Sequence, residues 1–128
     1  MLKKESPIYR DHLPMFVLDV LRYDIEKVDG ILELLNNRGC IGWRVFWERD
    51  FNRDEVVSAL EELVQRKMVC VLREQSMELV KCDPPKNFAD MADYLWFKIR
   101  KRGLEAWNEW IPPKRPDEDE SDNAPQPN

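Results

Sequence analysis

One stretch, residues 51–68, constrains the fold of this chain more than any other. It reads FNRDEVVSALEELVQRKM, in which Asn52 is followed three residues later by Glu55. This is the spacing of a capping box, where each side chain accepts a hydrogen bond from the other residue's backbone N–H. Apolar residues then recur at helical spacing, with Ala59 at the margin of their stripe: Val56, Val57, Leu60, Leu63 and Val64. The pattern predicts an amphipathic helix with one buried face.

The residues after this helix predict a short β-hairpin. The β-branched run MVCVL leads into a polar turn, REQS, and then into MELVKC. Pro84 and Pro85 end the second strand, because neither residue can donate a hydrogen bond to a ladder.

Two helices are predicted before residue 51. The first runs from Pro14, which suits a first helical turn, to Tyr23, with Asp11 or His12 near its cap. It is apolar almost all round, which indicates a central or interface helix; it buries Met15, Phe16, Leu18 and Leu21, with Val17 and Val20 at its edges. The second runs from Ile25 or Lys27 to Asn37, weakened at Gly30 and stopped at Gly39; its buried face holds Ile31, Leu32, Leu34 and Leu35.

Two further elements complete the expected order. GWRVFWERDF, residues 42–51, alternates in the manner of a short strand, with Trp43, Val45 and Trp47 on one face. A last helical region begins at Asn87, where Phe88, Met91, Ala92, Leu95 and Trp96 keep helical spacing. The segment KIRKRG interrupts it, and Leu104, Trp107, Trp110 and Ile111 resume it before Pro112.

The length of 128 residues predicts one folded domain. We expect a flexible lead-in at 1–12, the domain at 13–111, and a disordered acidic Pro-rich tail at 112–128, which has little to bury. Five of the 25 acidic residues lie at 117–122, where there is no Lys or Arg, so residues 1–116 hold 20 acidic and 20 basic residues. The folded part is therefore neutral.

No apolar run approaches the roughly 20 residues that a membrane-spanning helix needs. The N-terminus MLKKESPIYR is too polar for a secretory signal, so we expect a cytoplasmic protein with no membrane association. The three cysteines, Cys40, Cys70 and Cys82, have no C-x-x-C spacing. Reduced, buried thiols are expected rather than a disulfide framework or a zinc site.

The order helix, helix, helix, hairpin, helix resembles a winged helix-turn-helix domain, and NRDEVVSALEELVQRKMVCVL is similar to the third helix and first wing strand of that superfamily. KIRKRGLEAWNEW resembles the segment that opens the last helix in MarR- or PadR-like members, with Gly103 and Trp107 at matching positions but Arg100 in place of the usual Thr. The implied fold class is mainly α with a small β-hairpin wing (α+β), in a single domain. Residues 38–51 also make the link between the second and third helices longer than in a DNA-reading helix-turn-helix.

The resemblance implies a test for DNA binding. The outward face of the third helix centres on Ser58 and Gln65, and four carboxylates and one guanidinium flank it: Asp54, Glu55, Glu61, Glu62 and Arg66. Such a face has the wrong sign for phosphates. The candidate DNA contacts are instead Arg73, expected at the tip of the wing, and a basic cluster: Lys98, Arg100, Lys101 and Arg102. This cluster is also read as a solvated turn.

No catalytic motif is present. The single histidine, His12, has no nucleophile beside it in sequence, and the sequence contains no G-x-S-x-G, Walker, G-x-G-x-x-G or H-E-x-x-H pattern. We therefore expect no catalysis, no cofactor and no metal.

Five tryptophans in one short chain point to aromatic surfaces. Trp96 and Trp107 read most simply as core, whereas Trp110 is the best candidate for an exposed anchor. Together with Phe16 on the apolar first helix, Trp107 and Trp110 are the candidate protein interface. Winged-helix relatives commonly dimerise through their first and last helices. We expect a protein-interaction or assembly module that forms a homodimer or binds another protein, with a DNA-binding regulator as the alternative.

Overall fold

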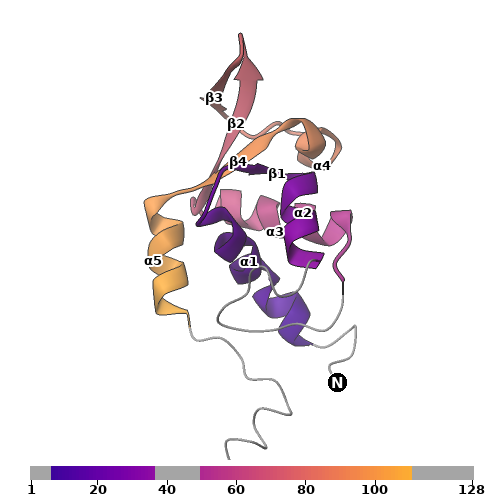
Figure 1. Ribbon diagram of the computed structural model, residues 1–128, viewed down its shortest axis with the longest axis vertical. Coiled ribbons are helices and arrows are strands. Elements are labelled where there is room, and N and C mark those ends of the chain that lie inside the picture. Colours follow the sequence, from indigo (N-terminus) through magenta and orange to yellow (C-terminus); the bar gives the residue numbers. More distant parts are fainter. Residues whose placement is uncertain (1–6, 37–49, 111–128) are drawn as a thin grey trace, which may run out of the picture.

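The structure, a computed structural model, describes residues 7–36 and 50–110 and has the α+β architecture expected from the sequence (Figure 1). Helices lie on one side of a four-stranded antiparallel sheet, and the β2–β3 hairpin projects beyond them. The elements are α1 (Pro7–Leu21), β1 (Glu26–Lys27), α2 (Val28–Asn36), α3 (Arg53–Gln65), β2 (Val69–Gln75), β3 (Glu78–Cys82), α4 (Phe88–Met91), the 3-10 turn η1 (Ala92–Tyr94), β4 (Trp96–Ile99) and α5 (Lys101–Glu109).

The predicted capping box begins α3. The Asn52 side chain accepts a hydrogen bond from the Glu55 N–H at 2.9 Å, and the Glu55 carboxylate accepts one from the Asn52 N–H at 3.0 Å. The predicted apolar stripe faces the core, where all its members except the half-buried Val64 are buried. A local sequence signal therefore positions the central helix.

The end of α3 turns the chain into the sheet. Lys67 adopts the left-handed conformation with φ 63°, which a glycine usually occupies at this position. The Met68 N–H donates to the Leu63 carbonyl at 3.0 Å, and the Lys67 N–H donates to the Val64 carbonyl at 3.0 Å. This is the bonding pattern of a Schellman motif.

Helix α1 starts earlier than predicted. It begins at Pro7, so Pro14 lies inside the helix rather than in its first turn, and the helix enters the predicted lead-in. Pro14 removes one backbone hydrogen bond. The apolar side chains that follow it are buried in the core, among them Phe16, Val17 and Leu18, and their burial offsets that loss. Of the two predicted roles of this helix, central or interface, its burial supports the central one.

Helix α2 is present as predicted but starts at Val28, because Glu26–Lys27 forms strand β1. Ile31 and Leu35 of its predicted buried face are buried, and Leu32 and Leu34 are half-buried. Its last residue is tied to the start of α3, because the Asn36 amide donates to the Phe51 carbonyl at 3.0 Å and accepts from the Phe51 N–H at 2.8 Å. The predicted Trp-rich strand, except for its last two residues, and the predicted stop at Gly39 lie outside the described residues, as does the acidic tail.

The predicted helix over residues 87–96 is wrong, whereas its predicted resumption after KIRKRG corresponds to α5. The apolar residues of 87–96 are divided among the four-residue helix α4, the turn η1 and the strand β4. Strand β4 inserts between β1 and β2, giving the order β1-β4-β2-β3. Strand β2 has an unpaired edge after the hairpin forms, and Trp96–Ile99 satisfies that edge by pairing with Val69–Leu72.

The hairpin turn lies later than predicted. Gln75 pairs with Glu78, so the two-residue turn is Ser76-Met77 rather than the segment REQS. Both turn residues have positive φ, at 53° and 67°. That geometry belongs to a type I′ turn, whose twist matches that of the two strands.

None of the helices in residues 7–36 and 50–110 combines the length and the apolar character needed to cross a membrane.

Candidate interaction surfaces

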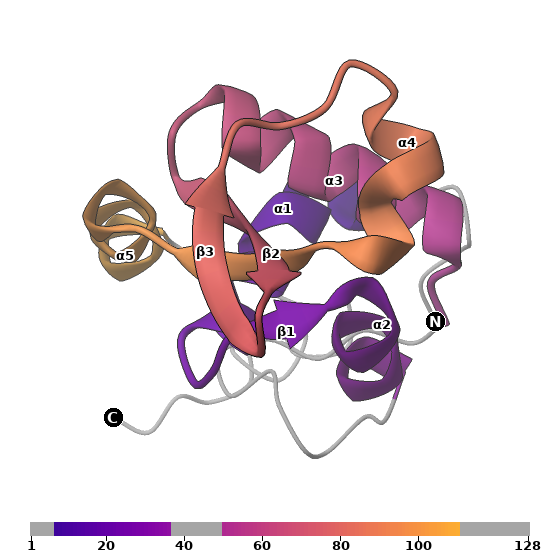
Figure 2. The ribbon, with the colours of Figure 1, turned by 90° about the horizontal axis from the view of Figure 1, so that it is seen from above.

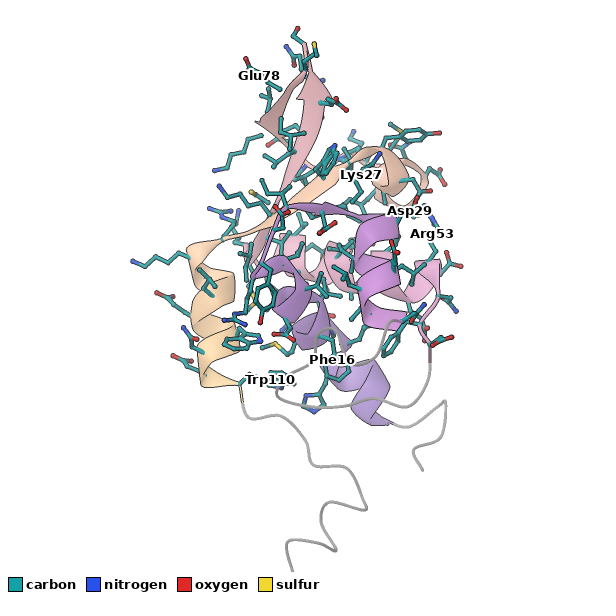
Figure 3. The ribbon with its side chains drawn as sticks, viewed as in Figure 1. Phe16, Lys27, Asp29, Arg53, Glu78 and Trp110 are labelled. Carbon is teal, nitrogen blue, oxygen red and sulfur yellow. The ribbon has the colours of Figure 1, made fainter. Side chains whose placement is uncertain are left out.

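The aromatic residues predicted to form an interface pack mainly within the chain. Phe16 is only 1% exposed, and its ring lies edge-on to Trp110, with 5.9 Å between the centroids (Figure 3). Trp110 is half-buried, and its indole N–H donates to His12 Nδ1 at 3.1 Å. The expected contact between the first and last helices is thus made inside one copy of the chain.

Trp107 is held by a second contact between the same helices. The Arg22 guanidinium carbon lies 3.7 Å from the centroid of the Trp107 ring, which is a close cation–π contact. The same guanidinium approaches the buried Asp19 carboxylate at 3.5 Å. Trp107 therefore joins α5 to α1, in agreement with its reading as a core residue.

Gly103 explains part of the G-x-x-x-W pattern. It is buried, and a Cβ on this residue would lie 2.4 Å from the Met68 carbonyl oxygen and 2.9 Å from Ile99 Cγ1. The missing side chain lets the first turn of α5 touch the start of β2. The pattern thus has a packing role in this chain.

The predicted basic cluster is split by the structure. Arg100, Lys101 and Arg102 line a surface cavity of about 570 Å³ together with Lys67 and one carboxylate, Glu105. Lys98 lies one step away on β4, where it pairs with Cys70. Lys67 is absent from the predicted cluster and lines this cavity from the left-handed position after α3.

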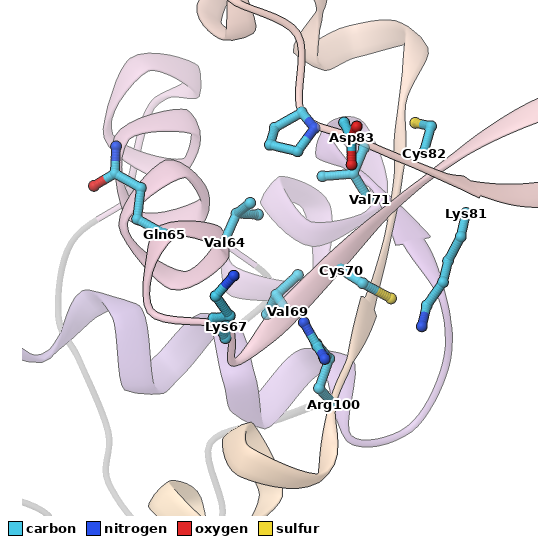
Figure 4. Close-up of a pocket in the computed structure, with 11 residues that line it drawn as sticks. Val64, Gln65, Lys67, Val69, Cys70, Val71, Lys81, Cys82, Asp83 and Arg100 are labelled. Atoms are coloured by element: carbon cyan, nitrogen blue, oxygen red, sulfur yellow. The ribbon is translucent and has the colours of Figure 1, made fainter.

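A second cavity of about 430 Å³ adjoins the first at Arg100 and Lys67, and Lys81 of β3 also lines it (Figure 4). Cys70 and Cys82 lie in its wall, and both are free thiols that are half-buried rather than buried as expected. Burial raises the pKa of the Cys82 thiol, although the nearby Arg73 charge opposes this. The raised pKa disfavours a thiolate nucleophile at neutral pH.

The prediction that Arg73 lies at the tip of the wing is wrong. It pairs with Val80 inside the hairpin, and Ser76 and Met77 form the tip. The two-residue turn moves the tip toward the C-terminus, away from the only arginine of the hairpin.

The polar face of α3 remains solvent-exposed at Ser58 and Gln65. Its one expected cation, Arg66, is paired with Glu62 at 2.9 Å. At the first turn, the Arg53 guanidinium donates to the Asp93 carboxylate at 3.0 Å and to the Ala89 carbonyl at 2.6 Å. These bonds place the segment α4–η1 beside the start of the helix, the part that would approach base edges in a DNA-reading arrangement.

The projecting hairpin is the most exposed part of the described chain. Every residue from Arg73 to Lys81 is exposed, and three of them are large and apolar: Met77, Leu79 and Val80. Strand β4 pairs with β2 only as far as Leu72. Beyond Leu72 the described chain is a two-stranded ribbon with an open backbone edge on each side.

In the part of the chain that the structure describes, no group of three or more His, Cys, Asp or Glu residues is placed to hold a metal ion. No family model, curated protein or solved structure matches the chain.

Proposed function

We propose that this chain is a non-enzymatic protein-interaction or assembly module, that its projecting hairpin is the docking element, and that it forms a homodimer. The observation that carries the proposal is the open ribbon beyond Leu72. A two-stranded hairpin alone has marginal stability in water, and its free edges offer N–H and C=O groups for pairing with another strand. Pairing with a second copy satisfies these groups and covers the exposed apolar side chains.

The residue at the turn adds support. Met77 is 94% exposed and has a φ of 67°. Its side chain therefore adds nothing to the core, and its backbone conformation is unfavourable for a residue with a Cβ. Glycine or asparagine is the residue type that a type I′ turn favours. A strained residue with a large apolar side chain at the most exposed point of the fold is consistent with a contact residue.

The finer fold assignment is also a proposal. We infer a winged-helix relationship from the helix order, the capped third helix followed by a hairpin, and the G-x-x-x-W pattern that opens α5. The short helix α4 beside the start of α3 and the insertion of β4 between β1 and β2 are departures from a simple winged helix. They favour a binding role that does not insert α3 into a DNA groove.

Sedimentation equilibrium of the full chain over a range of concentrations tests the homodimer. We expect the double variant Leu79→Lys/Val80→Lys to be monomeric at concentrations where the unaltered chain is dimeric, because lysines on an edge strand oppose strand pairing. Leu104→Lys on α5 is the matched control, because Leu104 and Leu79 are 39% and 38% exposed. It should remain dimeric.

The control also separates the two candidate interfaces. If Leu104→Lys dissociates the dimer and the hairpin variant does not, the interface lies on the last helix, as the resemblance implied. An unaltered chain that is monomeric throughout would refute the homodimer.

DNA binding is the second candidate, favoured by the gathering of Lys67 with Arg100, Lys101 and Arg102 around one carboxylate. Four cations are enough to neutralise several phosphates. The test is binding of duplex DNA of random sequence at low salt, with and without residues 117–128. Binding that falls steeply with salt and strengthens without the acidic tail supports this candidate; no binding by either form excludes it.

A further inference from the structure

The strand register places eight residues on one face of the sheet, and three of them are lysines. Lys27 pairs with Trp96, Trp96 with Leu72, and Leu72 with Lys81, so one row crosses all four strands. Directly paired residues in antiparallel strands point to the same side. The next pairs on this side are Cys70 with Lys98 in one direction along the strands and Glu74 with Leu79 in the other, because each residue lies two positions from a member of the row. We call these eight residues the lysine face: Lys27, Cys70, Leu72, Glu74, Leu79, Lys81, Trp96 and Lys98.

The lysine face is the side of the sheet opposite the helices. The alternate residues of the same strands, Val69, Val71 and Phe97, are buried in the core. In the view from above, α1 and α3 lie behind the sheet (Figure 2). Leu72 is only 6% exposed yet is not part of the core cluster, so its neighbours on the lysine face cover it. The face is thus a packed surface.

The charge and the aromatic ring of this face lie together. The eight residues include three lysines and one carboxylate, that of Glu74, although residues 1–116 are neutral as a whole. Lys27 Nζ lies 5.6 Å from the centroid of the half-buried Trp96 ring. Tyr94 ends the turn η1 two residues earlier and is 69% exposed. Cations and aromatic rings are the two kinds of group that hold a single nucleic-acid strand.

The surface continues beyond the strands. Lys81 and Cys70 also line the cavity of about 430 Å³, which carries the positive charge on to Arg100 and Lys67. One carboxylate, that of Asp83, lies among these residues. A bound anionic polymer that crosses the row from Lys27 to Lys81 would therefore meet further cations where β4 leads into α5.

We propose that the lysine face binds single-stranded nucleic acid, with phosphates on Lys27, Lys81 and Lys98 and an unstacked base on Trp96. The three lysines stand on three different strands, so they reach different phosphates of one backbone. An acidic peptide would satisfy the lysines and leave the aromatic rings unused. A duplex keeps its bases stacked and offers no ring to Trp96. Lys27, Trp96 and Lys98 lie outside the hairpin segment on which the proposed dimer rests, and Lys81 adjoins that segment.

The test is fluorescence anisotropy of the full chain with a labelled oligo-dT of about 12 nucleotides, a length within the range of known single-strand sites. We expect measurable affinity at low salt that exceeds the affinity for a duplex of equal length. Lys81→Glu should weaken binding about fivefold and reduce the slope of log affinity against log salt by about 0.7, the loss of one phosphate contact on a single strand. Lys86→Glu, the same charge change at an exposed residue of the loop after β3, is the matched control and should leave the slope unchanged.

The aromatic contribution is tested separately. Trp96→Ala should weaken binding about tenfold, within the range for loss of one stacked base, and Trp96→Phe should restore most of it. Circular dichroism checks that each variant is folded, and Lys81→Glu tests the site without altering the aromatic ring.

Three results would overturn the proposal: no binding by the unaltered chain at low salt, equal weakening by Lys81→Glu and Lys86→Glu, or equal affinity for a labelled poly-glutamate peptide. The last result would identify an acidic peptide as the ligand. Sedimentation of the same samples reports the oligomeric state, so failure of this site and failure of the dimer are distinguishable.

Discussion

Gly103 of α5 lies so close to Met68, the residue before β2, that a Cβ at Gly103 would be 2.4 Å from the Met68 carbonyl oxygen. That oxygen also accepts a hydrogen bond from the Arg100 N–H at 2.9 Å. This bond holds the backbone before α5 against the backbone before β2, so neither segment can move away easily. We expect Gly103→Ala to lower the free energy of unfolding by about 1–3 kcal/mol, the usual cost of overpacking. Urea denaturation measures the change.

Gly30→Ala is the matched comparison, because both glycines lie in helices. A Cβ at Gly30 would meet only the end of the Glu26 side chain, which is able to rotate away. Alanine then improves helix propensity, by up to about 1 kcal/mol. A loss of stability at Gly30 equal to that at Gly103 would contradict this account of the two sites.

Leu60 occupies the centre of the buried face of α3 and is fully buried. Leu60→Asp places an unpaired charge there, so we expect a loss of about 4 kcal/mol or more and an unfolded domain. Ser58→Asp, on the exposed face of the same helix, should change stability by no more than about 0.5 kcal/mol. Circular dichroism distinguishes the two variants, and a folded Leu60→Asp would show that the helix face is wrongly assigned.

Lys67 occupies a left-handed position that glycine adopts without steric cost. We expect Lys67→Gly to raise the free energy of unfolding by about 1 kcal/mol, because the steric cost of a Cβ in this conformation disappears. If DNA binding is real, the same variant should weaken it, because Lys67 lines the cationic cavity beside Arg100. Thermal unfolding and duplex binding measure the two effects; lower stability of the variant would count against the Schellman assignment.

Glu26 carries an unfavourable charge in the folded chain. Burial raises its pKa above the ordinary value of 4.5, and the carboxylates of Asp24 and Glu33 raise it further. The folded state therefore holds this proton more tightly than the unfolded state, so this residue's contribution to stability increases as the pH falls through the raised pKa. Glu26→Gln should be more stable than the unaltered chain at about pH 7, and the difference should shrink at about pH 4. A difference that does not vary with pH would exclude this cause.

Removal of residues 117–128 tests the expectation that the acidic tail does not contribute to the fold. The segment holds five acidic residues and no large apolar side chain. We expect the melting temperature to stay nearly unchanged, because such a segment has little apolar surface to bury. A drop of several degrees would mean that the tail is docked on the domain.

The sequence predicts the centre of the fold best where the signals are local. The capping box of Asn52 and Glu55 involves residues three apart, and the apolar stripe of α3 is periodic over a few turns. Both can therefore be predicted without knowing which distant residues they contact. The hairpin is predictable for the same reason, although the polar segment REQS predicts its turn earlier than the structure has it. A type I′ turn made by Ser76-Met77 lacks the Asn-Gly or Gly-Gly pair by which such turns are usually read.

The candidate surfaces were predicted less well, because they depend on strand register. Lys27, Lys81 and Lys98 are far apart in the sequence and share a face only through the pairings of β4 with β1 and β2 and of β2 with β3. Phe16 and Trp110 are large and apolar, which predicts an interface, but that property does not distinguish an intramolecular contact from an intermolecular one. The packing of the Phe16 ring against Trp110 of the same chain shows that the contact of Phe16 is intramolecular.

What the sequence determined by itself is the set of elements whose stabilising contacts lie within a few residues: α2, α3 and the hairpin. Only the tertiary structure decided that Trp96–Ile99 is a strand, although its neighbours have helical spacing. The free edge of β2 provides hydrogen-bond partners there that outweigh local preference, and Phe97 gains full burial. Likewise, the burial of side chains after Pro14 keeps α1 helical through a residue that usually begins a helix. In both places, contacts with residues distant in the sequence stabilise a conformation that the local sequence pattern does not predict.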